Sequence, residues 1–242
     1  MSPSGLHYFP VALPFLLLLA GLLAATVVIV AVKVLRFTSS SLGVGPWTMF
    51  ALLLASLLGS YVNIPIAKLP EREISTVAEV TYFGVRYAVP VVRDWPATLV
   101  AINVGGAVIP ILFSVYLLAK TRLYGPSFVA ILVVATACHL VARPVPGLGI
   151  AVPVVVPPLV TAVIALLLSR RHSAALAYIG GSLGTLIGAD LLNLGRVQGL
   201  GAPIVSIGGA GTFDGIFVTG LLAVLYASVA THGVEPAKTE NG

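Results

Sequence analysis

The chain has 242 residues, of which 58% are hydrophobic and only 9% are charged. A soluble domain carries about 25% charged residues, so this composition excludes an ordinary soluble domain and indicates an integral membrane protein. The formal net charge is +5, but no run of basic residues exceeds two, so we also exclude a nucleic-acid-binding protein. The single cysteine, Cys138, cannot form an intrachain disulfide.

In lipid the backbone must satisfy its own hydrogen bonds, and a spanning helix needs about 20 apolar residues. The fold class expected is therefore all-α, a polytopic membrane helix bundle forming one domain over residues 1–242. About seven apolar segments meet this description, at roughly 9–32, 46–67, 97–119, 126–142, 149–169, 173–195 and 205–231. The first is long for a signal peptide and is interpreted as a retained helix.

The connections contain two irregular regions. Prolines crowd residues 143–158 and predict a discontinuous or re-entrant element there, because proline cannot donate a backbone hydrogen bond. Residues 74–92 are rich in Val, Thr and Tyr, and Phe83-Gly84 offers a turn. This pattern predicts a β-hairpin within an extracytoplasmic insertion at 68–96, which could be a lid or an edge for an extended peptide. The alternative is an amphipathic connection lying on the membrane.

Charge predicts the orientation, because Lys and Arg concentrate in cytoplasmic connections. If the N-terminus is outside, the inner connections hold Lys33, Arg36, Lys120, Arg122, Arg170 and Arg171, whereas the short outer ones hold Arg143 and Arg196. We therefore expect a multi-pass protein of the cell membrane, with its N-terminus outside and a cytoplasmic tail at 232–242.

Two acids, Asp190 and Asp214, fall inside apolar segments; the other six lie in the polar connection or the tail. An acid near the bilayer centre costs about 2.5–3.5 kcal/mol, so it is retained mainly where it pairs or works. The predicted spans place Asp190 roughly 9 Å and Asp214 roughly 6 Å toward the outer side of the midpoints. Glycines around both acids, including a stripe at Gly180, Gly184 and Gly188, permit close packing of helices.

Two carboxyl groups near contact tend to share one proton. Such a pair can activate a water with its carboxylate while its acid protonates a carbonyl oxygen, which is the chemistry of aspartic proteolysis. The alternative is a structural pair, or one acid capped by backbone.

The segments that carry these acids resemble two motifs of presenilin and signal peptide peptidase. Ala189-Asp190-Leu191-Leu192 is similar to their Tyr-Asp motif, and Gly211-Thr212-Phe213-Asp214-Gly215 is similar to their Gly-x-Gly-Asp motif. Pro146-Gly147-Leu148 could stand in for their Pro-Ala-Leu motif. The resemblance implies a catalytic pair of Asp190 and Asp214, with these neighbouring residues in supporting or substrate-binding roles.

The whole chain resembles an uncharacterised family of prokaryotic polytopic membrane proteins, a domain of unknown function. That likeness rests on Asn63-Ile64-Pro65, on the segments 143–147 and 188–190, and on the glycine-rich segment 208–215. It implies no known activity.

Polar residues in the apolar segments offer a second kind of site. Asn193 shares a helix face with Asp190 at a spacing of three. Asn63 and Asn103 could ligate Na⁺ or relay protons, although interhelical hydrogen bonding is the favoured role for both. Cys138 and His139 are adjacent and point about 100° apart, so no metal site is expected, and no cofactor is implied.

Three hypotheses for function follow. The first is an intramembrane aspartyl-protease-like protein that hydrolyses peptide bonds of membrane substrates with Asp190 and Asp214. The second is an ion- or proton-coupled secondary transporter that uses the same acids. The third is a structural membrane protein without turnover. The partners expected are the lipid bilayer and, for the first hypothesis, a membrane peptide; the sequence indicates no particular oligomeric state.

Overall fold

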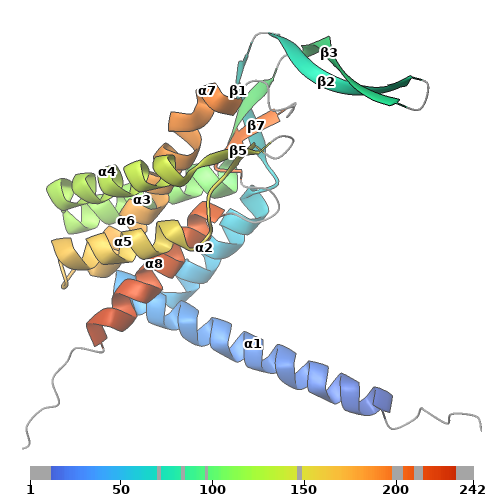
Figure 1. The fold of residues 1–242 in the computed structure, drawn as a ribbon. Helices are drawn as coiled ribbons and strands as arrows, with labels where there is room; N and C mark the ends of the chain where they lie inside the picture. The colour runs from blue at the N-terminus through green and yellow to red at the C-terminus, as the bar shows by residue number, and fades with distance from the viewer. Residues whose placement is uncertain are drawn as a thin grey trace, which may run out of the picture.

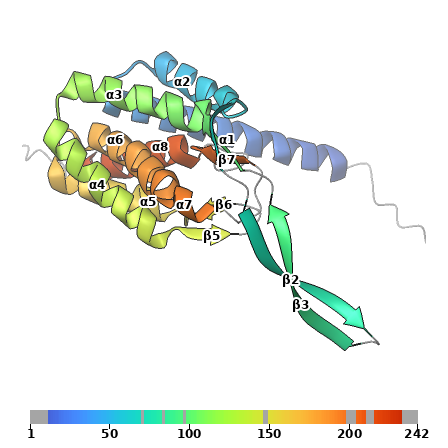
Figure 2. The same ribbon diagram turned by 90° about the horizontal axis from the view of Figure 1, so that it is seen from above.

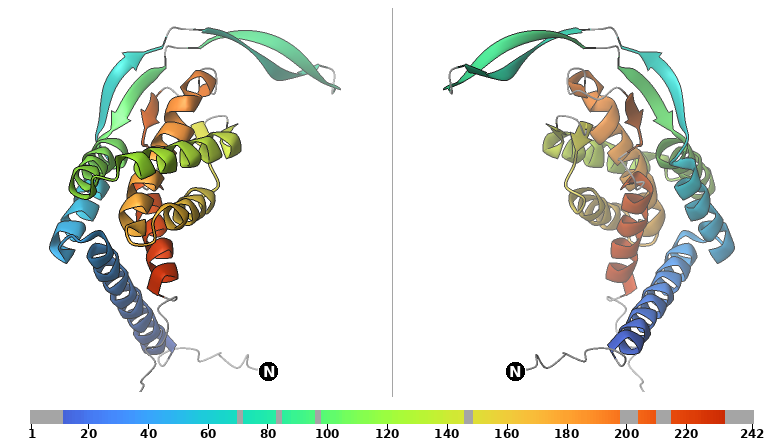
Figure 3. Two further views of the ribbon diagram at one scale, coloured as in Figure 1. Left: turned by 90° about the vertical axis from the view of Figure 1, so that its left-hand side faces the viewer. Right: turned by 90° about the vertical axis from the view of Figure 1, so that its right-hand side faces the viewer.

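The computed structural model describes residues 12–69, 72–82, 85–95, 98–145, 149–197, 204–209 and 215–232. Helices pack into a bundle, from which a long helix and a long β-hairpin project (Figure 1). Figure 3 shows that these two projections leave the bundle at opposite ends.

The helical segments follow the predicted apolar runs closely. The α-helices are α1 (Ala12–Leu42), α2 (Pro46–Gly59), α3 (Ile109–Thr121), α4 (Tyr124–Val141), α5 (Val156–Leu168), α6 (Ser173–Thr185), α7 (Leu194–Val197) and α8 (Gly215–His232). A π-helical turn, η1 (Val104–Val108), precedes α3, and a second, η2 (Leu186–Asp190), continues α6. The 3-10 turn η3 (Leu191–Asn193) joins η2 to α7.

Several helices have the dimensions of membrane spans. Among the described residues, four segments are long and apolar enough to cross a bilayer: Leu16–Leu42, Val104–Thr121, Tyr124–Val141 and Ser173–Val197. The helices α2 and α5 are apolar but shorter. The chain thus has the character of a membrane protein, and seven crossings stay a prediction.

Three ends of the predicted spans form strands of one sheet instead of helix. Strand β1 (Asn63–Lys68) pairs antiparallel with β4 (Leu99–Asn103), which pairs in parallel with β7 (Ile204–Ile207). The helical predictions over 63–67, 99–103 and 205–207 were therefore wrong. The physical reason is that these stretches are rich in β-branched Val and Ile and pair across long sequence separations, which an apolar run does not reveal.

The predicted hairpin is present and longer than expected. Strand β2 (Arg72–Tyr82) pairs with β3 (Val85–Trp95) in an unbroken antiparallel register from Arg72 opposite Trp95 to Tyr82 opposite Val85. The strands β1 and β4 lead into this ribbon, which extends away from the bundle (Figure 1). The side of the membrane on which it lies stays a prediction.

The proline-rich region is irregular, as predicted, but it contains strands. Strands β5 (Arg143–Val145) and β6 (Gly149–Ala151) form a small antiparallel pair after α4. Pro157 and Pro158 do not break α5; they lie in its first turn, where the missing N–H groups would have no helical partner anyway.

The bundle has two distinct ends. The sheet β1–β4–β7 and the π-helical turns lie at one end, which we call the sheet end. The short connections α1–α2, α3–α4 and α5–α6 lie at the other, which we call the turn end (Figure 1). The α1–α2 and α3–α4 connections are joined there, because Lys120 Nζ donates a hydrogen bond to the carbonyl oxygen of Gly43 at 2.6 Å.

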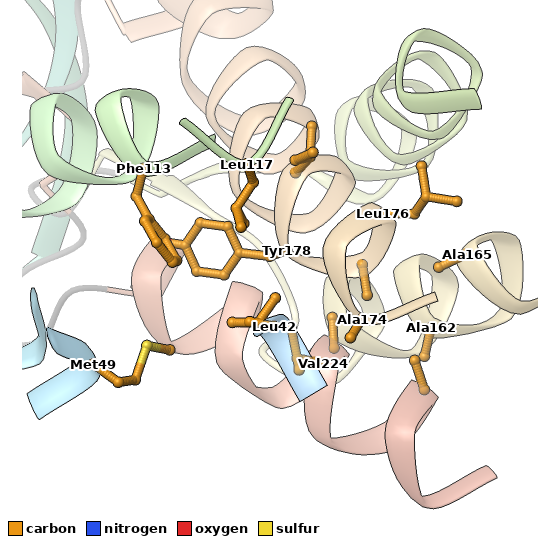
Figure 4. Packing of buried hydrophobic residues seen from close by; sticks show 14 residues of the cluster. Leu42, Met49, Phe113, Leu117, Ala162, Ala165, Ala174, Leu176, Tyr178 and Val224 are labelled. Atoms are coloured by element: carbon orange, nitrogen blue, oxygen red, sulfur yellow. The ribbon is translucent and has the colours of Figure 1, made fainter. Parts of the chain in front are cut away.

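Helix α6 is the centre of the bundle and contacts α3, α4, α5 and α8 (Figure 2). Its Tyr178 is fully buried, with its ring edge-on to Phe113 at 4.8 Å between centroids. Leu117, Leu42 and Val224 from other helices surround the same ring (Figure 4). The core is therefore built around this one helix.

The predicted glycine stripe of this helix packs on α4. A methyl group on Gly180 would lie 3.0 Å from the Cβ of Ala130, and one on Gly184 would lie 2.7 Å from the Cβ of Val134. One on Gly188 would overlap the backbone of Ala135. Small residues at this spacing let two membrane helices approach closely.

Candidate functional site

Asp190 lies at the sheet end, at the last position of the π-helical turn η2. Such a turn is rare and is frequently found at functional sites. The carboxylate oxygen Oδ2 of Asp190 accepts a hydrogen bond from the backbone N–H of Gly208, at 2.6 Å. A charge-assisted bond of this kind is roughly twice as strong as a neutral one. It ties the end of the central helix to the segment that follows β7.

Gly208 reaches this position because it has no side chain. Its φ of +80° lies in the left-handed region that favours glycine. A methyl group here would lie 2.6 Å from the carbonyl carbon of Gly106 and 2.7 Å from the backbone nitrogen of Ala107. The strand β7, the turn η1 and the Asp190 carboxylate therefore meet at one glycine.

The two asparagines of the predicted polar set lie beside this junction and bond to each other. Asn103 Nδ2 donates to Asn63 Oδ1 at 3.1 Å and to the carbonyl oxygen of Ser60 at 2.7 Å. Asn103 Oδ1 accepts from the backbone N–H of Gly106 at 2.8 Å and so caps the turn η1. Ser206 Oγ donates to Asn63 Oδ1. These amides hold strands and a helix start together, so hydrogen bonding is their observed role.

Asn193 is completely buried, and its side chain turns back to its own helix. Its Nδ2 donates to the carbonyl oxygens of Gly188 at 2.8 Å and Ala189 at 3.0 Å. Its Oδ1 accepts from Arg196 Nη1 at 3.2 Å. Asn193 therefore satisfies carbonyls that the irregular turn exposes. Arg196 was not predicted as the partner of Asn193, although a spacing of three residues places both on one helix face.

Most of the second motif lies outside the described residues. Its residues Gly211, Thr212, Phe213 and Asp214 all lie outside them. Pro146 and Gly147, from the segment compared with the Pro-Ala-Leu motif, also lie outside the described residues. Gly215 is the first residue of α8. The helices that carry the two motifs do pack on each other: a methyl group on Gly220 of α8 would lie 2.6 Å from Ser182 Oγ of α6.

The described residues offer no site for a metal ion, since no group of three or more His, Cys, Asp or Glu side chains gathers among them. Cys138 is buried and lies 3.8 Å from Thr185 Oγ1, which precedes the turn η2. This contact adds a polar link between α4 and α6 close to Asp190 in the chain.

The family model described as a protein of unknown function, DUF1614, matches residues 57–226. The chain belongs to the DUF1614 family. The match spans α2 to α8, so the sheet, the hairpin and Asp190 all lie within the DUF1614 region, whereas α1 precedes it. It confirms membership of an uncharacterised family and lends no support to a presenilin likeness or a prokaryotic origin. No curated protein and no solved structure matches the chain.

Proposed function

We propose that this DUF1614 chain is an intramembrane aspartyl-protease-like protein in which Asp190 and Asp214 form the catalytic pair. In this reaction one carboxylate removes a proton from a water, which attacks the peptide carbonyl carbon. The other carboxyl group donates its proton to the carbonyl oxygen, which gives a tetrahedral diol. The first carboxyl group then passes the proton it took from water to the leaving nitrogen, and the second takes a proton back from the diol as the C–N bond breaks, so both groups return to their starting states. The substrates proposed are membrane peptides, because both acids belong to apolar segments.

The observation that carries the proposal is the hydrogen bond from Gly208 N–H to Asp190 Oδ2, at 2.6 Å. Gly208 opens the connection that ends at Gly215, the first residue of α8, and Asp214 is the residue just before that helix. The first acid is thus bound to the chain segment that carries the second. A backbone donor on Oδ2 fixes the carboxylate, and we assign Oδ1 to the attacking water.

The backbone around Asp190 is irregular, which is compatible with a route for water. The turns η1 and η2 and the strands β4 and β7 interrupt helices in or beside segments with the length of a membrane span. Irregular backbone at membrane depth is tolerated only where it is buried in protein or lines a watery cavity. Hydrolysis needs such a route, because its nucleophile is water.

The proposal is tested with purified protein and a panel of membrane-spanning peptides. We expect the wild-type protein to cleave at least one peptide. Asp190→Asn and Asp214→Asn should each lower the cleavage rate by roughly 10³-fold or more, as is typical of losing a catalytic group. Asp94→Asn in β3 is the matched control, because it removes an acid of the hairpin and not one of the two acids in apolar segments, and it should cleave normally. Equal cleavage by wild type and the Asp214→Asn variant would end the protease assignment.

A second function, proton- or ion-coupled transport through the same acids, is favoured by a different observation. The hydroxyl groups of Ser114, Ser127 and Ser182 are buried on α3, α4 and α6 and have no hydrogen-bond partner among the described residues. Buried hydroxyls normally have a partner, so these three give the interior polar groups that a proton or cation could use. In proteoliposomes this function predicts a cation or proton flux that Asp190→Asn abolishes, without peptide cleavage.

A further inference from the structure

The turn end of the bundle carries a cluster of basic side chains that the proposed reaction does not use. We call it the basic cluster; it comprises Lys33, Arg36, Lys120, Arg122, Arg170 and Arg171. All six residues are exposed. They come from the end of α1 and from the α3–α4 and α5–α6 connections, so separate parts of the chain deliver positive charge to one end.

No acidic side chain balances this charge within the described part of the chain. The described acids are Glu73, Glu79 and Asp94 in the hairpin and Asp190 at the sheet end. The C-terminal tail adds Glu235 and Glu240 but also Lys238. The basic residues therefore outnumber the acids even when the tail is counted, so an anionic partner would meet net positive charge at this end.

One member of the cluster, Lys120, is held in place before any partner binds, and a second, Arg122, has an unusual backbone conformation. Lys120 Nζ donates to the Gly43 carbonyl oxygen at 2.6 Å and lies 5.8 Å from the centre of the Tyr116 ring. Arg122 follows the end of α3 with a φ of 55°, a left-handed conformation in which glycine is usual. An arginine is strained in this conformation. The strain suggests that the residue is kept for its charge and not for its backbone preference.

From this geometry we infer that the basic cluster binds the phosphate groups of anionic phospholipids in the adjoining leaflet. The apolar surface of α1 supports a lipid as the source of the phosphate: Leu18, Leu22 and Leu23 are 68%, 62% and 65% exposed. Apolar side chains of this kind contact acyl chains, which places the headgroups at Lys33 and beyond. Each Lys or Arg near an anionic surface contributes about 1 kcal/mol, which is about fivefold in affinity.

Native mass spectrometry in detergent micelles tests the inference, since it needs no defined orientation in a membrane. The protein is mixed with phosphatidylglycerol or with phosphatidylcholine of the same acyl chains, and retained lipid is counted. We expect the wild-type protein to retain phosphatidylglycerol preferentially. Arg122→Gly should weaken this retention about fivefold, and the double variant Arg170→Gln, Arg171→Gln about 25-fold.

Arg122→Gly also separates binding from folding, because it removes the charge while relieving the left-handed strain. Its melting temperature in micelles without added lipid should therefore equal or exceed that of the wild type. Arg143→Gln, an exposed single-charge change at the sheet end, is the matched control and should retain lipid normally. Undiminished retention by the turn-end variants would overturn the inference. So would an equal loss with Arg143→Gln, or displacement of the lipid by millimolar inorganic phosphate.

Discussion

Gly188 sets the distance between α4 and α6 next to the candidate acid. A methyl group there would overlap the carbonyl oxygen of Ala135 and lie 2.7 Å from its Cα, and both are backbone atoms that cannot rotate away. We expect Gly188→Ala to destabilise the protein by about 1–3 kcal/mol, the usual range for overpacking a core.

The measurement is thermal unfolding in detergent, with Gly195→Ala as the matched control. Gly195 follows Asp190 by five residues, and a methyl group on it would meet nothing within 4 Å. Alanine has the higher helix propensity, so this control should be neutral or slightly stabilising. Equal melting temperatures for both variants would contradict the role assigned to Gly188.

Residue by residue, the sequence singled out Asp190 but did not predict its hydrogen-bond partner. The isolation of Asp190 in an apolar segment was enough to single it out, because charge is rare in lipid. Its donor, Gly208, was not predictable, since that bond joins residues on two elements through a left-handed glycine. Asn193 was placed beside Asp190 by helical spacing. The residues between them form the 3-10 turn η3, and the Asn193 amide bonds Gly188 and Ala189 instead.

Among the elements, η2 accommodates one extra residue next to Asp190. A π-helical turn contains one more residue than the equivalent α-helical turn, because its hydrogen bonds run from i to i+5. Deleting Ile187 should therefore convert η2 to an α-helical turn that leaves Asp190 facing nearly the same direction. Gly180 and Gly184 precede the deleted residue in the chain, so their packing on α4 should be unchanged.

For the Ile187 deletion we expect helical circular dichroism close to that of the wild type, and any activity that depends on the direction of Asp190 should be retained. Ile187→Ala is the control, because it truncates the same side chain but keeps the chain length. If the deletion variant lost activity that Ile187→Ala keeps, the π-helical turn itself, and not only the direction of Asp190, would be required.

The strands illustrate which elements a single sequence can predict. The hairpin β2–β3 was predictable because its strands are adjacent in the chain and flank a turn. The sheet β1–β4–β7 was not, because β7 pairs with β4 from about 100 residues further along the chain, and the hydrophobic pattern of an isolated strand does not name a distant partner. Pro65 in β1 was compatible with an edge strand, which is the position β1 occupies.

For the whole molecule, the two ends of the bundle differ in charge as well as in structure. The described acids all lie in the hairpin or at the sheet end. The charged side chains described at the turn end are all basic. The candidate acid and the irregular backbone therefore lie toward the hairpin. This asymmetry was visible in the sequence as the distribution of Lys and Arg among the connections, and the bundle gathers three of those connections at one end.

The charge asymmetry predicts the orientation of the protein in a cell, because Lys and Arg in short connections are retained on the cytoplasmic side. Single cysteines report this directly once the buried Cys138 is changed to serine. With a membrane-impermeant maleimide, Thr76→Cys in β2 should be labelled on intact cells, since the hairpin would lie outside. Arg171→Cys in the α5–α6 connection should be labelled only after the membrane is opened. The Cys138→Ser protein without a new cysteine should show no labelling, and the opposite pattern for the two positions would place the hairpin, and Asp190 with it, toward the cytoplasm.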